Sequence, residues 1–133
     1  MKFTKEEMAF LEPARVARLA TVDAGGIPHN VPICPVYAGG RFYFGTEAES
    51  KKVRNIKANG NVSLVFDEYT ESWGKLRGVM IRGQAKIAGK QEFELLRRRL
   101  YEKFSQYQAS APLDEKGSVI VEVVPRDKFS WGF

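Results

Sequence analysis

Apolar and polar residues alternate along several short segments of the chain, which is the pattern of partly buried β-strands. We expect strands over residues 15–23, 27–37, 41–46, 62–67, 76–88 and 118–124. Gly- and Asn-containing turns separate several of them, as in Gly25-Gly26 and Gly39-Gly40. The pattern therefore predicts six strands connected in short antiparallel steps.

Three other segments carry helix signals. Thr4 and Glu7 form a capping-box pattern at the start of the first helix, and Ser50 precedes a second that runs to Ala58. Between residues 90 and 107 apolar residues recur at helical spacing, namely Phe93, Leu96, Leu100 and Phe104. Helices inserted between antiparallel strands indicate an α+β, mainly β, fold built around a small barrel. We do not expect a Rossmann sheet, because the chain lacks G-x-G-x-x-G and a regular strand-helix alternation.

Length and composition narrow the class of protein. A chain of 133 residues predicts one domain spanning residues 1–133. The single cysteine, Cys34, has no partner for a disulfide, and one histidine cannot complete a zinc site, so we expect no metal. Without an apolar run of about 20 residues or a signal sequence, we expect a cytoplasmic protein without a membrane partner.

The formal net charge is +5, from 21 Lys and Arg against 16 Asp and Glu. A positive balance favours anionic partners at long range. A nucleotide, a phosphorylated cofactor and a nucleic acid all satisfy this condition, so charge alone does not separate them.

Prolines interrupt the second expected strand at positions 28, 32 and 35. Because proline cannot donate to a sheet ladder, this strand must have an unpaired side. Two interpretations remain open, a ligand or partner subunit beside the strand, or an ordinary edge strand.

Two lysines follow the expected N-cap of the second helix. Ser50 leaves the backbone N–H groups of the first turn free at the positive end of the helix dipole, where an anion is favoured. Lys51 and Lys52 are unfavourable there unless something negative compensates them. A bound phosphate would do so, and the alternative is that Glu47 and Glu49 offset the lysines without a ligand.

Four segments together resemble the pyridoxamine 5'-phosphate oxidase-like family of FMN-binding split barrels. They are LATVDAGGIPHNVPI (19–33), FYFGTEAESKKVRNI (42–56), ANGNVSLVFDEY (58–69) and VMIRGQAKI (79–87). The resemblance spans roughly residues 15–90 and implies a six-stranded antiparallel split β-barrel. The chain length, the loop from Asp67 to Trp73 and the strand after it are similar to the small deazaflavin-dependent oxidoreductases of this superfamily.

The resemblance implies a set of cofactor-binding residues. Thr46, Ser50, Lys51 and Lys52 match the family positions that bind the phosphate of FMN. The second strand would run along the isoalloxazine ring, mostly through the backbone of Asn30, Val31, Pro32, Ile33 and Cys34. Arg54 would reach the ribityl chain or a partner subunit. No catalytic residue is implied, and His29 is only a candidate because it lies near the same edge.

The chain also departs from the pyridoxamine phosphate oxidases proper. An Arg and a Lys of their second strand are replaced here by Val31 and Val36, and no arginine follows Arg126. We therefore do not expect oxidation of vitamin B6.

The function implied is an oxidoreductase that transfers hydride to or from an unknown small molecule, with FMN or, alternatively, the 5-deazaflavin coenzyme F420. The family also implies a homodimer with the cofactor at the interface, for which Phe129, Trp131 and Phe133 offer apolar surface. Two alternatives are a flavin carrier or sensor without turnover and a basic barrel that binds single-stranded nucleic acid. The nucleic-acid alternative is disfavoured because the cations form no single stripe.

Overall fold

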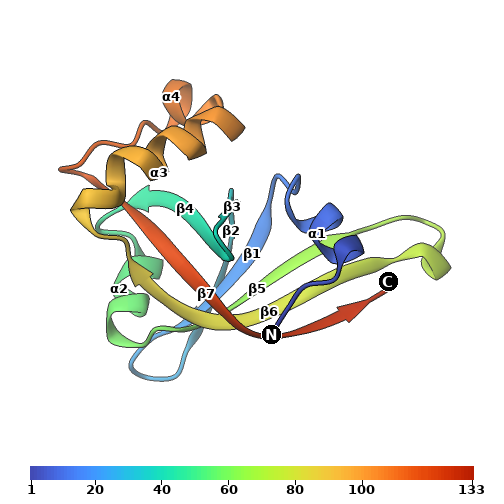
Figure 1. The fold of residues 1–133 in the computed structure, drawn as a ribbon. Coiled ribbons are helices and arrows are strands. Elements are labelled where there is room, and N and C mark those ends of the chain that lie inside the picture. Colours follow the sequence, from blue (N-terminus) through green and yellow to red (C-terminus); the bar gives the residue numbers. More distant parts are fainter.

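The computed structural model describes residues 1–133 as one sheet with helices at its ends and edges (Figure 1). The strands are β1 (Ala17–Val22), β2 (Pro28–Ile33), β3 (Val36–Ala38), β4 (Arg41–Glu47), β5 (Asn61–Glu68), β6 (Arg77–Ile87) and β7 (Ser118–Trp131). The helices are α1 (Lys5–Leu11), α2 (Lys51–Ala58), α3 (Lys90–Lys103) and α4 (Gln106–Ser110), with a 3-10 turn, η1 (Trp73–Lys75).

The sheet has seven strands, so the expectation of six was wrong. The difference lies in residues 27–37, which form two strands, β2 and β3, instead of one. Cys34 and Pro35 separate them, and the missing N–H of Pro35 prevents a continuous ladder. The antiparallel, mainly β character and the insertion of helices between strands are as predicted.

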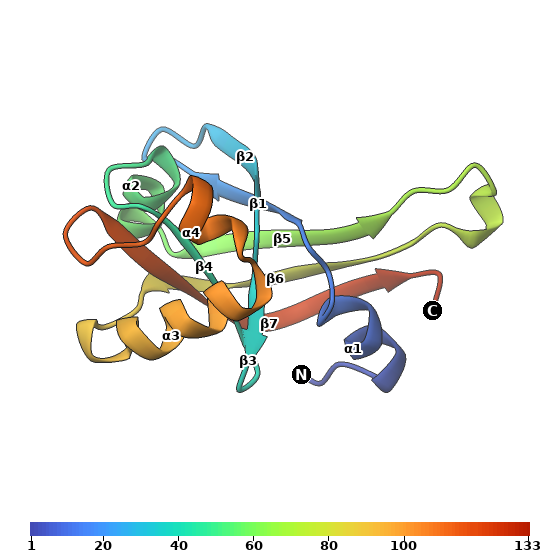
Figure 2. The same cartoon turned by 90° about the horizontal axis from the view of Figure 1, so that it is seen from above.

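The strand order explains why the sheet curls. It is β2-β1-β5-β6-β7-β4-β3, so the two edge strands are consecutive in the chain. Only Cys34 and Pro35 connect them, so the two edges must approach each other, and the sheet bends into an incompletely closed barrel (Figure 2). β2 pairs with β1 alone, which confirms that the proline-containing strand has an unpaired side.

The last strand is longer than the sequence suggested. We expected it to end at Val124, before Pro125, but β7 continues to Trp131. The register with β6 shifts between Arg82 and Gly83, which pair with Asp127 and Pro125, leaving Arg126 as an extra residue. This β-bulge accommodates the proline inside a paired strand.

The helices begin where capping predicts, but the third is shorter than expected. Thr4 and Glu7 form the predicted capping box of α1. The segment 90–107 divides into α3 and α4, because the helix breaks at Phe104, which adopts an extended conformation. No helix of the protein has both the length and the apolar character needed to cross a bilayer.

Two apolar clusters stabilise the fold. The larger fills the barrel with residues from β1, β4, β5, β6 and β7, among them Leu19, Phe44, Leu64, Ile81 and Val121. The smaller lies between the α3–α4 segment and the sheet, and contains Phe93, Leu96, Leu100, Phe104, Tyr107, Tyr43, Leu113 and Ile120. This second cluster brings α4 to the end of the barrel where the candidate site lies.

The hairpin of β5 and β6 projects beyond the rest of the sheet (Figure 2). Its tip carries Tyr69 and Trp73, which are 65% and 73% exposed. The hydroxyl of Tyr69 donates to Glu71 and accepts from the indole N–H of Trp73, so the tip is ordered by its own side chains.

Candidate functional site

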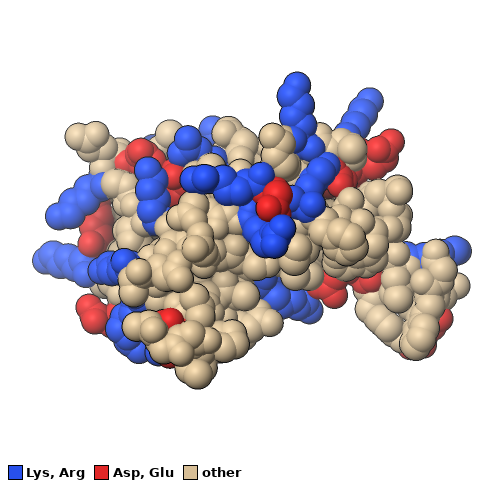
Figure 3. Space-filling model, turned by 90° about the horizontal axis from the view of Figure 1, so that it is seen from below, with Lys and Arg blue, Asp and Glu red and all other residues tan.

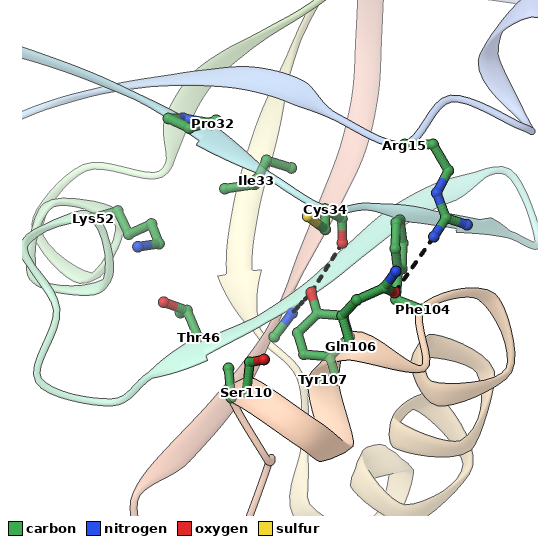
Figure 4. A pocket seen from close by; sticks show the side chains of 12 residues that line it. Arg15, Pro32, Ile33, Cys34, Thr46, Lys52, Phe104, Gln106, Tyr107 and Ser110 are labelled. Atoms are coloured by element: carbon green, nitrogen blue, oxygen red, sulfur yellow. Dashed lines mark hydrogen bonds between the residues drawn. The ribbon is translucent and has the colours of Figure 1, made fainter.

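A pocket of about 450 Å³ opens where the two edges of the sheet approach each other (Figure 4). It lies between the end of β2, strand β4, the start of α2 and the α3–α4 segment. Its lining residues are Arg15, Pro32, Ile33, Cys34, Gly45, Thr46, Lys52, Phe104, Gln106, Tyr107, Ser110 and Ala111. This size and this mixture of apolar walls with a few polar groups are typical of cofactor sites.

The start of α2 contains an unsatisfied polar atom. Ser50 occupies the N-cap position as predicted, but its side chain makes no capping hydrogen bond. The hydroxyl oxygen is buried and is the only buried side-chain polar atom in the protein without a hydrogen-bond partner. An orphaned hydroxyl costs about 1–3 kcal/mol, so its retention beside free backbone N–H groups fits a site for an anion.

Lys52 lines the pocket and forms no ion pair or hydrogen bond within the protein (Figure 4). Burial lowers the pKa of its ammonium, while the carboxylate of Glu47 acts in the opposite direction. A half-buried ammonium without a hydrogen-bonded acceptor is stabilised by any anion that enters the pocket. Thr46, which precedes it at the end of β4, lines the same part of the pocket.

Lys51 and Arg54 are not brought into this pocket. The ammonium of Lys51 lies 3.6 Å from a carboxylate oxygen of Asp23, in the turn after β1. Arg54 donates a hydrogen bond of 2.6 Å to the backbone carbonyl of Glu49. The two adjacent lysines therefore differ, since Asp23 compensates the charge of Lys51 and no carboxylate forms an ion pair with Lys52.

The second strand reaches the pocket only through its last residues. Pro32, Ile33 and Cys34 line the wall. Asn30 instead lines a separate hollow on the outer face of the sheet. Val31 does not line the pocket, and neither does His29, whose partner across the ladder is Thr21.

Tyr107 joins the two sides of the pocket at its base (Figure 4). Its hydroxyl donates to the carbonyl of Cys34 at 2.9 Å and accepts from the backbone N–H of Gly45 at 3.3 Å. Burial is the main reason that the pKa of Tyr107 is raised to about 12, so the phenol is neutral at physiological pH. It therefore holds α4 against β4 and against the connection between β2 and β3.

Gly45 has to be small at this point. A Cβ added to Gly45 would lie 2.5 Å from a side-chain carbon of Leu113, which packs over the strand. The segment after α4 can therefore approach β4 closely and close the lower wall of the pocket.

Sequence reasoning missed the pocket residues that lie just before β1 and in and around the α3–α4 segment, which are Arg15, Phe104, Gln106, Tyr107, Ser110 and Ala111. It also missed Gly45, in β4. Most are remote in sequence from Thr46, Ser50 and Lys52, and Phe104 carried one signal, as part of an apolar stripe. A second signal was available in Tyr107, an aromatic residue with a polar tip near the end of the same amphipathic segment.

The chain belongs to the pyridoxamine 5'-phosphate oxidase family, whose model matches residues 3–131. That match covers nearly the whole chain, including β7 and the α3–α4 segment, which lay outside the resemblance seen in the sequence. The family assignment made from the four motifs is confirmed.

Individual relatives differ in what they bind. A 5a,11a-dehydrotetracycline/5a,11a-dehydrooxytetracycline reductase from Streptomyces rimosus is 34% identical over 94 residues, which span 64% of this chain and 63% of that protein. An F420 reductase has a TM-score of 0.77 at 23% identity, covering 96% of this chain and 98% of its own. The heme storage protein HutZ from Vibrio cholerae has a TM-score of 0.81 at 18% identity, covering 97% and 94%. At these identities the two structures establish the fold and not the ligand.

Proposed function

We propose that this protein is a flavin-type oxidoreductase that binds FMN or a deazaflavin by its phosphate at the start of α2 and transfers hydride to or from a small molecule. The observation that carries the proposal is the pair formed by the orphaned Ser50 hydroxyl and the unpaired Lys52 ammonium. Membership of the pyridoxamine 5'-phosphate oxidase family supports a cofactor of the flavin type.

The residues of the pocket would divide the work of binding. Lys52 and Thr46, which line the pocket, would bind the phosphate, and a charged acceptor makes such hydrogen bonds strong. Ser50 does not line the pocket, so its buried hydroxyl would reach the phosphate only from behind the pocket wall at the start of α2. Pro32, Ile33 and Cys34 line one wall of the pocket and would shield one side of the ring from water. A bound flavin or deazaflavin ring would supply the hydride chemistry, so the protein needs no acid or base of its own.

Placement of the other predicted residues refines their proposed roles. Lys51 would act on the phosphate only at longer range, because Asp23 already compensates its charge. Arg54 and Asn30 would belong to the surroundings of the site instead of its wall, since neither lines the pocket.

The reductase from Streptomyces rimosus supports an oxidoreductase in preference to a carrier, although the aligned region spans under two thirds of that protein. Val31 and Val36 replace the charged residues expected of an enzyme acting on vitamin B6. We therefore propose reduction or oxidation of another small molecule. FMN is the first choice of cofactor, and the deazaflavin is the alternative.

We also propose a homodimer formed through the outer face of the sheet. A cross-strand row on this face contains Pro32, Arg18, Val65, Met80 and Phe129, paired in that order. Phe129 is 63% exposed and its ring lies 6.0 Å from that of Trp131. Within the row Arg18 pairs with Asp67, and Arg82 pairs with Asp127 beside it, so the face combines apolar residues with paired charges, which suits a second copy of the same surface.

The proposed dimer interface on the outer face can be tested without knowing the substrate. We expect Phe129→Glu to convert a dimer into a monomer, measured by light scattering after size-exclusion chromatography. The matched control Phe133→Glu changes an aromatic residue that is also exposed but lies beyond the row. A monomeric wild-type protein would contradict the proposed dimer and leave the phosphate site untouched.

The function itself is tested by titrating apoprotein with FMN, the deazaflavin coenzyme and single-stranded RNA, followed by fluorescence. We expect micromolar or tighter binding of one ring cofactor and no comparable binding of RNA. Lys and Arg are spread over the face seen in Figure 3 with Asp and Glu among them, which argues against a continuous track for a nucleic-acid backbone. Binding of RNA alone would contradict the proposal, whereas cofactor binding with no photoreduction or hydride uptake would favour a carrier.

A further inference from the structure

The pocket carries a second cation at the side opposite Lys52. Figure 4 shows Arg15 and Lys52 on opposite sides, with Ile33 and Cys34 between them. Neither cation forms an ion pair with a carboxylate in the protein. A phosphate bound at Lys52 would compensate one of them and leave the other without a partner.

Arg15 is held in place by neutral groups. Its guanidinium donates to the backbone carbonyl of Lys103 at 2.8 Å and to the side-chain oxygen of Gln106 at 3.4 Å, and lies 4.4 Å from the centre of the Phe104 ring. A guanidinium has five N–H donors, so several remain free. Because the side chain is already ordered, less conformational entropy is lost when an anion binds to it.

The ammonium of Lys103 adds a further positive charge close to Arg15. The ammonium of Lys103 donates to the carbonyls of Glu12, Ala14 and Pro35 at 2.7–2.9 Å, and so fixes the chain on either side of the pocket entrance. Burial lowers the pKa of Lys103, and repulsion from Arg15 lowers it further. An anion beside Arg15 would relieve that repulsion.

We infer that Arg15 binds an acidic group of the substrate, so that the substrate is a small planar or partly apolar molecule bearing a carboxylate or an enolate. Its apolar part would pack against Phe104, which lines the pocket beside Arg15 on the side away from Lys52. This assignment rests on the proposed function, because it places the substrate beside a cofactor anchored at Lys52. Arg15 is a specificity-determining residue in this scheme.

The test uses a matched pair of ligands that differ in charge. Protein saturated with FMN is titrated with 2-naphthoate and with the neutral 2-naphthamide, and binding is followed by the visible absorbance of the flavin. We expect the wild-type protein to prefer the carboxylate by about tenfold, on the scale of a hydrogen bond to a charged group. In Arg15→Met we expect this preference to fall to about one, with the affinity for naphthamide unchanged.

Two further variants separate the effect of the Arg15 guanidinium on the carboxylate preference from effects of net charge and of folding. Arg15→Lys keeps the charge and should retain part of the preference. Arg126→Met removes an exposed arginine that lies outside the pocket and has no hydrogen bond or ion pair, and should retain all of it. An unchanged preference in Arg15→Met would overturn the inference.

The same variants show whether Arg15 binds a group of the substrate or the cofactor itself. We expect Arg15→Met to leave the dissociation constant of FMN unchanged within about twofold, unlike Lys52→Met. Equal losses of FMN affinity in the two variants would overturn the inference, because Arg15 would then serve the cofactor. If the wild-type protein binds no FMN, the proposed function fails, and an Arg15-dependent preference measured in the apoprotein would still support the anion site.

Discussion

The starts of α1 and α2 differ in how completely their polar groups are satisfied. At α1, Thr4 and Glu7 exchange hydrogen bonds, and the buried carboxylate of Glu7 also pairs with Lys128. At α2, the hydroxyl of Ser50 has no partner, no acidic residue lies in the first turn, and Lys52 has no counter-charge in contact. Both helices pack on the same barrel. Exposure to solvent therefore does not by itself explain why the polar groups are satisfied at the start of α1 and not at the start of α2.

The comparison separates groups that stabilise the fold from groups that we propose bind a ligand. A satisfied helix start adds to the free energy of unfolding, and its loss should destabilise the protein without touching the cofactor. An unsatisfied one costs stability in the absence of ligand. Its loss should weaken cofactor binding and leave the apoprotein at least as stable as before.

The largest effect is expected at Glu7. Burial alone would raise its pKa, but hydrogen bonds from Lys128, Thr4 and Ser130 outweigh burial and lower the pKa to about 2. We expect Glu7→Gln to lower the free energy of unfolding by about 3 kcal/mol at neutral pH, because it leaves Lys128 unpaired. Urea unfolding measures this loss, and FMN titration of the folded variant should show unchanged affinity.

The same carboxylate predicts a pH dependence. Its pKa is 4.5 in an unfolded chain and about 2 in the folded protein, so its stabilisation is complete above about pH 5 and is lost as the pH falls toward 2. The difference in stability between wild type and Glu7→Gln should therefore shrink between pH 6 and pH 3. A constant difference over this range would show that the carboxylate does not stabilise the folded state in its ionised form.

The next largest effect is expected at Lys52. We expect Lys52→Met to weaken FMN binding by about 1–3 kcal/mol, because a charged hydrogen bond to the phosphate is removed. The stability of the apoprotein should not fall, since burial already disfavours the charged form of this lysine. Lys51→Met is the matched control, with a much smaller effect on FMN binding because Asp23 holds that ammonium.

The smallest effects come from the two N-cap residues, compared directly. Thr4→Ala should cost about 1 kcal/mol of stability and leave FMN affinity unchanged. Ser50→Ala should weaken FMN binding by about 1 kcal/mol and should not destabilise the apoprotein, since its hydroxyl has no bond to lose. Equal destabilisation of the apoprotein by the two substitutions would remove the distinction between the helix starts.

Much of the fold could be predicted because it is encoded locally. Alternation predicted the strands, the capping box predicted α1, and Ser50 and Asn59-Gly60 bounded α2. The strand count failed at Cys34 and Pro35, where an unbroken apolar run conceals the change from one sheet edge to the other. The bulge at Arg126 was missed because a proline normally ends a strand, and the β6 register that accommodates it is not visible locally.

The site, like the fold, was predictable only where its residues are encoded in local sequence. Lys52, Thr46, Pro32, Ile33 and Cys34 belong to continuous motifs, and all line the pocket. The opposite wall comes from Arg15 and the α3–α4 segment, which tertiary packing alone brings together. Spacing in the sequence also could not distinguish Lys51 from Lys52, because the choice depends on where the turn after β1 places Asp23.

The most direct test compares FMN with riboflavin, which lacks the phosphate, on wild-type protein and on Lys52→Met. The account predicts that wild type binds FMN at least tenfold more tightly than riboflavin and that the variant loses most of this advantage while its riboflavin affinity stays the same. Equal binding of FMN and riboflavin by the wild-type protein would contradict a phosphate site at the start of α2.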